Sequence, residues 1–181
     1  GCGYGEFLLS IKSFSDTISL KGSEPNTFKR DFAVKKGLDV GFFEIEDLKE
    51  KYEVISLLNV YSHLPNPVEF LTSLKNKLTE KGELIIETGD RTFYNSKNIP
   101  KPLYLPDHLS FTTEKNLKKM LEDIGFSIIS IKKYPILKLN VKTFIKEFIK
   151  LLSPVHKTRI RYFFSKKALI ESDMYIRAKL K

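Results

Sequence analysis

Two nearly continuous apolar runs, separated by one amphipathic segment, constrain this fold more than any other feature of the sequence. The first run, YEVISLLNV, covers Tyr52–Val60, and the second, GELIIET, covers Gly82–Thr88. Runs of this kind are typical of strands that are buried on both faces of a parallel sheet. The segment between them, Asn66–Leu78, has helical spacing, with Asn66 as the N-cap and Pro67 in the first helical position. This order of elements predicts a right-handed βαβ unit.

The rest of the chain continues the alternation of strands and helices. It therefore predicts an α/β, Rossmann-like fold with a mostly parallel sheet and helices on both faces. In such folds, ligands bind at the carboxyl ends of the strands. Helices are expected at Tyr4–Phe14, Thr27–Lys36 and Thr112–Gly125, a helical turn at Glu46–Lys51, and strands at Thr17–Asn26, Leu38–Ile45, Phe126–Tyr134 and Asp173–Leu180.

Length and composition indicate one domain, residues 1–181, of ordinary globular character. The single cysteine, Cys2, excludes an internal disulfide and a cysteine-rich zinc site, so no metal site is predicted. A reducing, cytoplasmic location is the simplest interpretation. The net charge of +9 lies in the C-terminal third, where residues 132–181 carry 14 Lys and Arg against three acidic residues. Much of this charge falls in a basic helical insertion at about 140–170.

A basic amphipathic helix is predicted inside this insertion, at residues 141–152. Its apolar face can pack on the domain as a substrate-side lid that leaves the lysines in water, and this is the interpretation we favour. The alternative is peripheral contact with an anionic membrane through the lysine face. Nucleic acid is a less favoured partner, because only the stretch RIRYFFSKK mixes aromatic and basic residues.

The first five residues, GCGYG, form a glycine-rich turn of the kind that connects a strand to a helix. A dinucleotide-binding fingerprint requires a glycine at the position of Glu6, and a carboxylate there opposes a bound pyrophosphate. The loop therefore suits a ligand without phosphate. Glu24 follows some twenty residues later at the end of a predicted strand, where an acidic side chain can accept hydrogen bonds from ribose hydroxyls.

These motifs together resemble class I S-adenosylmethionine-dependent methyltransferases, and most closely the branch that acts on small molecules, quinones, sugars and lipids. The resemblance rests on the ordered set GCGYG, GSEPN, FFEIEDL, YEVISLLNVYSHLPNP, LKNKLTEKGELIIET and PDHLSFTTEKNLKKMLEDIGF. It implies S-adenosylmethionine as the cofactor, a small-molecule or lipid-like acceptor, and an antiparallel last strand. By position, the resemblance assigns the cofactor site to Gly1, Gly3, Gly5, Glu24, Glu44, Ile45 and Asn59.

Methyl transfer to a hydroxyl needs a base, and two histidines follow predicted strands. His108 is the favoured candidate, and His63 is the second; either one can instead cap or pack a loop. Members of the family often carry Glu where this chain has Ser62, which makes the local motif atypical.

The same resemblance implies a central strand directly before the glycine loop, and no residue precedes Gly1 in the sequence. We therefore expect Gly1 to be a truncation point and the 181 residues to bind cofactor weakly by themselves. Two other functions stay open at this point. One is a non-catalytic fragment or remnant of such a domain, and the other is a nicotinamide-dependent dehydrogenase on a similar sheet.

Overall fold

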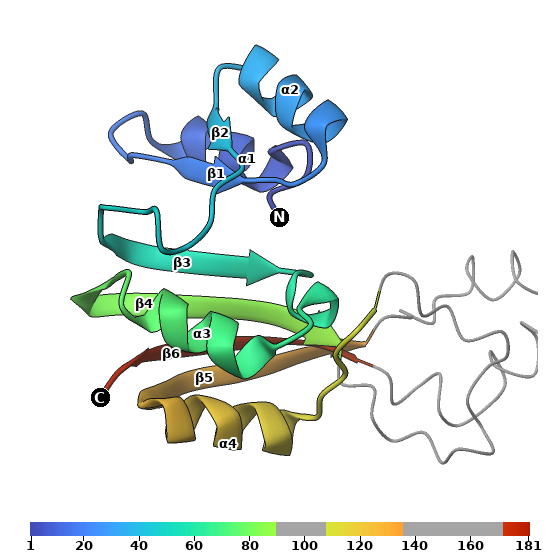
Figure 1. Cartoon of the computed structure of the whole chain (residues 1–181), viewed down its shortest axis with the longest axis vertical. Helices are drawn as coiled ribbons and strands as arrows, with labels where there is room; N and C mark the ends of the chain where they lie inside the picture. Colours follow the sequence, from blue (N-terminus) through green and yellow to red (C-terminus); the bar gives the residue numbers. More distant parts are fainter. Residues whose placement is uncertain (90–107, 136–171) are drawn as a thin grey trace, which may run out of the picture.

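The computed structural model describes residues 1–89, 108–135 and 172–181 (Figure 1). The expected basic insertion at about 140–170, with its amphipathic helix at 141–152, lies outside the described residues. The elements are α1 (Glu6–Phe14), β1 (Lys21–Ser23), α2 (Thr27–Lys35), β2 (Asp39–Gly41), β3 (Tyr52–Leu58), the short 3-10 helix η1 (Tyr61–His63), α3 (Pro67–Lys75), β4 (Leu78–Gly89), α4 (Glu114–Ile124), β5 (Phe126–Pro135) and β6 (Ser172–Leu180).

The described strands form two sheets. β1 and β2 pair in parallel, and four further strands pair in the order β3-β4-β6-β5. β3 and β4 are parallel, whereas β6 is antiparallel to both of its neighbours. The expected α/β, Rossmann-like fold with an antiparallel last strand is therefore confirmed. β6 inserts between β4 and β5, so the last strand of the chain is not an edge strand.

Local signals fix most helix ends. The Asn66 side chain caps α3, with Pro67 in its first turn, and the Thr113 hydroxyl accepts a hydrogen bond from the Asn116 N–H at the start of α4. Gly125 ends α4 with a φ of 106°, in the left-handed region that only glycine adopts without cost.

Several expected boundaries were wrong. The strand expected at Thr17–Asn26 is confined to Lys21–Ser23, and the strand expected at Leu38–Ile45 is confined to Asp39–Gly41. α3 ends at Lys75 rather than Leu78, because Leu78 begins β4, pairs with Tyr52 on β3 and is 1% exposed. The expected helical turn at 46–51 is instead a reverse turn in which the Asp47 and Leu48 N–H groups donate to the carbonyls of Glu44 and Ile45.

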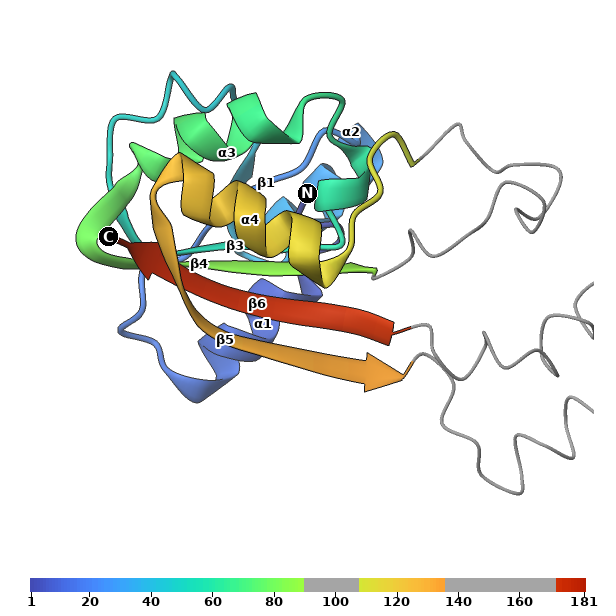
Figure 2. The ribbon, with the colours of Figure 1, turned by 90° about the horizontal axis from the view of Figure 1, so that it is seen from below.

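The main core lies on one face of the four-stranded sheet. α3 and α4 cover this face (Figure 2) and bury leucines against the inward-facing residues of β4 and β6. The opposite face carries polar cross-strand pairs, including a bidentate Arg177–Glu83 ion pair and a hydrogen bond of 2.8 Å from the Tyr175 hydroxyl to Glu87. A second, smaller core joins α1, α2 and β2 through Leu8, Ala33, Leu38 and Val40.

Candidate functional site

Backbone hydrogen bonds at the carboxyl ends of the strands join β1 to β2 and, separately, β3 to β4. The Glu24 N–H donates to the Gly41 carbonyl at 2.9 Å, and the Asn59 N–H donates to the Glu87 carbonyl at 3.1 Å. Glu24 follows β1 directly, and Asn59 follows β3 directly. The two side chains that the sequence assigned to strand ends therefore stand where that prediction put them.

The glycine loop, residues 1–5, is tied to the end of β1. The Cys2 N–H donates to the Ser23 carbonyl at 2.9 Å, and the Gly5 N–H closes the turn onto the Cys2 carbonyl at 3.0 Å. Gly5 has a φ of 82° and is the N-cap of α1, and a Cβ there would overlap the Leu38 side chain. Gly5 is therefore required by both backbone conformation and space, since other L-residues disfavour positive φ.

Glu24 is the polar centre of this region. Its side chain is 6% exposed, and its Oε2 accepts a hydrogen bond from the Gly3 N–H at 2.7 Å. Its Oε1 accepts a second hydrogen bond from the Asn26 N–H at 3.0 Å. These two backbone hydrogen bonds satisfy the buried carboxylate, and they hold the backbone of the loop in place. Sequence spacing indicated a polar role for Glu24 but gave no sign of this contact with Gly3.

The glycine loop also reaches the end of β3. A Cβ placed on Gly1 would lie 3.2 Å from Val60 Cγ2 and 3.9 Å from Glu24 Oε2. Gly1 therefore lies between the residues that follow β1 and β3. Three of the predicted cofactor residues meet here: Gly1, Gly3 and Glu24. Asn59 directly precedes Val60 in the chain.

Asn59 has an unusual backbone conformation. Its φ is 56°, and it is the one non-glycine residue with positive φ in the part of the chain that the structure describes. Asparagine tolerates this region better than other residues, because its short side chain can hydrogen-bond locally. Its side chain is exposed at the carboxyl end of β3. Such conformations cluster at ligand sites.

Glu44 and Ile45, the predicted adenine contacts, lie in the turn after β2. The Glu44 side chain is exposed, while Ile45 is partly buried and packs against the main core. Ile45 therefore has a packing role besides any role in binding.

The surroundings of Cys2 in the glycine loop determine the protonation state of its thiol. Burial raises the pKa of the Cys2 thiol, and the Glu24 carboxylate adds to this effect. The thiol is therefore protonated at neutral pH.

The two candidate bases lie together. The rings of His63 and His108 are 5.1 Å apart between centroids, at an interplanar angle of 62°. His63 ends η1 directly after β3, whereas His108 comes from the segment before α4. The sequence presented the two histidines as alternatives, and the structure joins them.

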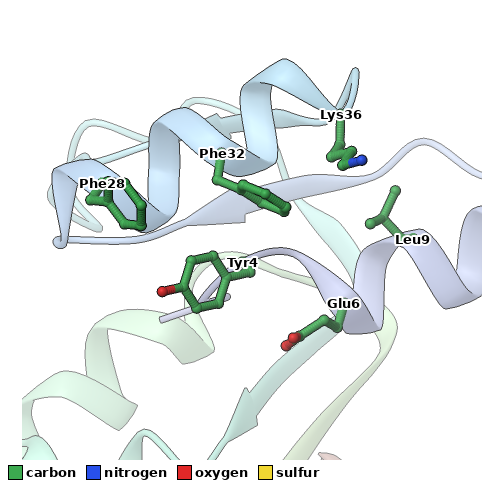
Figure 3. Close-up of a pocket in the computed structure, with 6 residues that line it drawn as sticks. All are labelled: Tyr4, Glu6, Leu9, Phe28, Phe32 and Lys36. Carbon is green, nitrogen blue, oxygen red and sulfur yellow. The ribbon is translucent and has the colours of Figure 1, made fainter.

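An apolar pocket of about 540 Å³ lies beside the glycine loop, between α1 and α2. Figure 3 shows Phe28 and Phe32 of α2 beside Tyr4, with Glu6 and Leu9 on α1. The Tyr4 ring packs edge-on against both phenylalanines, with centroid distances of 6.3 and 5.4 Å. Sequence reasoning missed this pocket, although Phe28 and Phe32 are four residues apart on a helix and share one face.

Among the described residues, no helix is long and apolar enough to cross a membrane.

Comparison with known proteins identifies one domain type. A family model described as a methyltransferase domain matches residues 1–131. The ubiquinone biosynthesis O-methyltransferase of Aliivibrio fischeri is 26% identical over 141 residues, which cover 67% of this chain and 59% of that protein. The tRNA U34 carboxymethyltransferase of Aliarcobacter butzleri is 32% identical over 101 residues, covering 51% of this chain and 31% of that protein.

Among solved structures, a geranyl diphosphate methyltransferase in complex with SAM superposes with a TM-score of 0.73 at 11% identity. The match covers 100% of this chain and 76% of that one. At this identity the likeness concerns the fold. The chain spans 59% and 31% of the lengths of these two curated relatives.

Proposed function

Because the chain belongs to the methyltransferase domain family, we propose that it transfers a methyl group from S-adenosylmethionine to a small-molecule or lipid-like acceptor. The observation that carries this proposal is the convergence of the glycine loop, Glu24 and the end of β3 around Gly1. The resemblance inferred from the sequence is confirmed at the level of the family.

The residues present fit a sulfonium nucleoside. A Cβ on Gly3 would meet nothing within 4 Å, so open space lies over the loop at this positive-φ position. Each Glu24 oxygen accepts one backbone hydrogen bond and keeps acceptor capacity for a ribose hydroxyl. A loop that has Glu6 in place of a third fingerprint glycine does not favour a pyrophosphate, which argues against a nicotinamide dinucleotide.

Gly1, Gly3 and Gly5 would lie under the methionine part of the cofactor, Glu24 would hold its ribose, and Asn59 would stand where cofactor and acceptor meet. Glu44 and Ile45 would contact the adenine edge. The bound cofactor supplies an activated methyl group, so the task of the protein is to orient the two reactants and exclude water.

The test is binding, measured by isothermal titration with S-adenosylhomocysteine and with NAD. We expect saturable but weak binding of S-adenosylhomocysteine by these 181 residues and none of NAD. Asn59→Gly should weaken the affinity for S-adenosylhomocysteine, because it removes the side chain while allowing the same backbone conformation. Glu83→Gln is the matched control, because Glu83 pairs with Arg177 on the other face of the sheet. Equal affinity in both variants would refute the role of Asn59, and binding of NAD alone would refute the proposed function.

Transfer is then followed with S-adenosylmethionine that is labelled in the methyl group. The acceptors compared are catechol, a short-chain ubiquinol and bulk tRNA, since one relative is named for a tRNA substrate. Label in either small molecule supports the proposal. Label in tRNA alone would make the nucleic acid the acceptor.

A further inference from the structure

We infer that the pocket between α1 and α2 binds a small apolar molecule that carries a single carboxylate, and that its occupancy tightens cofactor binding by the glycine loop. The pocket uses none of the residues that the sequence assigned to the cofactor. Binding in the pocket goes beyond the proposed function, and only the coupling to the cofactor rests on that function.

The size and the walls of the pocket fit a small apolar body. Its volume of about 540 Å³ falls in the range of about 300–1,000 Å³ that is usual for small-molecule sites. Three aromatic rings and one leucine line it: Tyr4, Phe28, Phe32 and Leu9. The Phe28 and Phe32 side chains are 72% and 41% exposed. Apolar surface that is open to water in this way gains free energy when a ligand covers it.

Two lysines make the pocket attractive to an anion. The Lys36 Nζ lies 5.5 Å from the centre of the Phe32 ring, and the Lys29 Nζ lies 5.8 Å from the centre of the Tyr4 ring. Neither lysine forms an ion pair with any residue that the structure describes. A carboxylate on the ligand would give the Lys36 ammonium the charged partner that the described residues do not provide.

Glu6 restricts the ligand to one anionic group. It lines the pocket from α1, and Figure 3 shows it across the pocket from Lys36 on α2. A ligand that carried negative charge to both sides would meet a like charge at Glu6. A monocarboxylate therefore fits the pocket, whereas a dicarboxylate or a phosphate monoester does not.

Tyr4 links the pocket to the glycine loop. It stands between Gly3 and Gly5, whose φ angles are 59° and 82°, and the Gly3 N–H donates to the Glu24 carboxylate. A ligand packed against the Tyr4 ring restrains the residue between these two glycines. Cofactor binding then has less loop motion to remove, so the two ligands favour each other. The coupling acts equally in both directions.

The first experiment is a titration of the isotope-labelled 181-residue chain, followed by the NMR shifts of its backbone amides. The probes are trans-cinnamate and octanoate, each compared with its neutral alcohol, cinnamyl alcohol or 1-octanol. We expect saturable shifts at Tyr4, Leu9, Phe28 and Lys36, with each acid binding more tightly than its alcohol. Saturation by cinnamate alone would assign the pocket to aromatic carboxylates, and saturation by octanoate alone would assign it to aliphatic ones. The absence of saturable shifts at these residues with both acids would refute the site.

Two charge variants test the recognition of the anionic group. Lys36→Gln should weaken binding of the acid by about 2–5-fold, the range expected for an exposed ion pair. Glu6→Gln should strengthen it by a similar factor, because the variant removes the opposing charge. Neither variant should change the affinity for the alcohol. Lys35→Gln is the matched control, because Lys35 is an exposed lysine of the same helix that does not line the pocket. Equal effects of Lys36→Gln and Lys35→Gln on the acid would refute the charge assignment.

Two phenylalanine variants test the recognition of the apolar body. Phe28→Ala should weaken binding of the acid and of the alcohol alike, by about tenfold. Phe14→Ala is its control, since Phe14 is 87% exposed on α1 and does not line the pocket. Both side chains are largely exposed, so both variants should stay folded, which the urea midpoint checks. Unchanged affinity in folded Phe28→Ala would show that the ligand binds elsewhere.

The last experiment measures the coupling by isothermal titration of S-adenosylhomocysteine with and without saturating acid. We expect the affinity for S-adenosylhomocysteine to rise about fivefold when the pocket is filled. Phe28→Ala should lose this gain at the same acid concentration. An unchanged affinity with the pocket filled would refute the coupling. If the wild type binds no S-adenosylhomocysteine under either condition, the proposed function fails, and the NMR titration still decides whether the pocket binds the acid.

Discussion

Replacing Glu24 tests the central claim about the glycine loop, that one buried carboxylate fixes its shape. Glu24→Ala removes the acceptor of two backbone N–H groups, those of Gly3 and Asn26. Both donors lie around a side chain that is 6% exposed, so water can replace the lost partner only in part. A buried donor left without a partner costs about 1–3 kcal/mol. Two such donors, partly rehydrated, lead us to expect a loss of about 2–4 kcal/mol in the free energy of unfolding.

Glu24→Gln should cost less, about 1–2 kcal/mol. The amide oxygen can still accept one of the two hydrogen bonds, but the amide NH₂ must then face the other backbone N–H. The control is Glu50→Ala. Glu50 lies near the same strand and pairs with Lys21 at 3.1 Å, but its side chain is 65% exposed. An exposed ion pair of this kind contributes little to stability, because solvent screens it.

The assay is urea unfolding followed by circular dichroism, with the slope m compared between variants. Unchanged m with a lower midpoint would show that stability itself has changed. The expected order of loss is Glu24→Ala, then Glu24→Gln, then Glu50→Ala. If Glu24→Ala is no less stable than Glu50→Ala, the carboxylate does not hold the loop, and the geometric basis of the proposed cofactor site is refuted.

Three further predictions concern particular residues. Gly5→Ala should destabilise the protein by at least about 2 kcal/mol more than Gly3→Ala. Both variants replace a glycine with positive φ, but only the Cβ added at Gly5 would overlap the Leu38 side chain. Equal urea midpoints for the two variants would contradict this. Asn59→Ala should cost about 1–2 kcal/mol of stability through its φ of 56°, whereas Asn59→Gly should cost almost nothing, as measured by thermal unfolding. The hydrogen bond from the Tyr175 hydroxyl to Glu87, together with burial, raises the pKa of Tyr175 from 10.0 to about 12. The stability that this hydrogen bond adds to the folded protein is therefore fully present below pH 10 and is lost as the pH rises through about 12. Urea unfolding across this window should show a shallower decline for Tyr175→Phe than for the wild type, and identical slopes would count against the bond.

Much of the fold could be predicted from the sequence because its signals are local. The capping residues Asn66 and Thr113 and the terminal Gly125 act on backbone groups within a few positions, so each helix end could be assigned without knowledge of the rest. The buried strands were likewise visible as apolar runs. The sequence failed where a non-local contact competed with a local preference, as at Leu78, which pairs with Tyr52 and leaves the helix for the strand.

The candidate site was predictable residue by residue but not as an arrangement. Glycines in a turn and an acidic residue at a strand end indicated a binding loop, and the family match supports that interpretation. The bond from Gly3 to Glu24 spans 21 residues, and the meeting of His63 with His108 spans 45. The spacing indicated a ligand role for Glu24, but nothing in the sequence indicated either contact.

The sequence alone therefore determined the order of most helices and strands and the caps of α3 and α4, because propensity, capping and periodicity act over a few positions. The tertiary structure alone decided that β6 enters between β4 and β5, that Glu24 turns its carboxylate onto the glycine loop, and that two histidines form a pair. These features depend on sheet order and on backbone hydrogen bonds between distant segments. Such contacts form only when the whole chain has packed. Many residues in distant segments together determine the free energy that favours them, and no single segment does so alone.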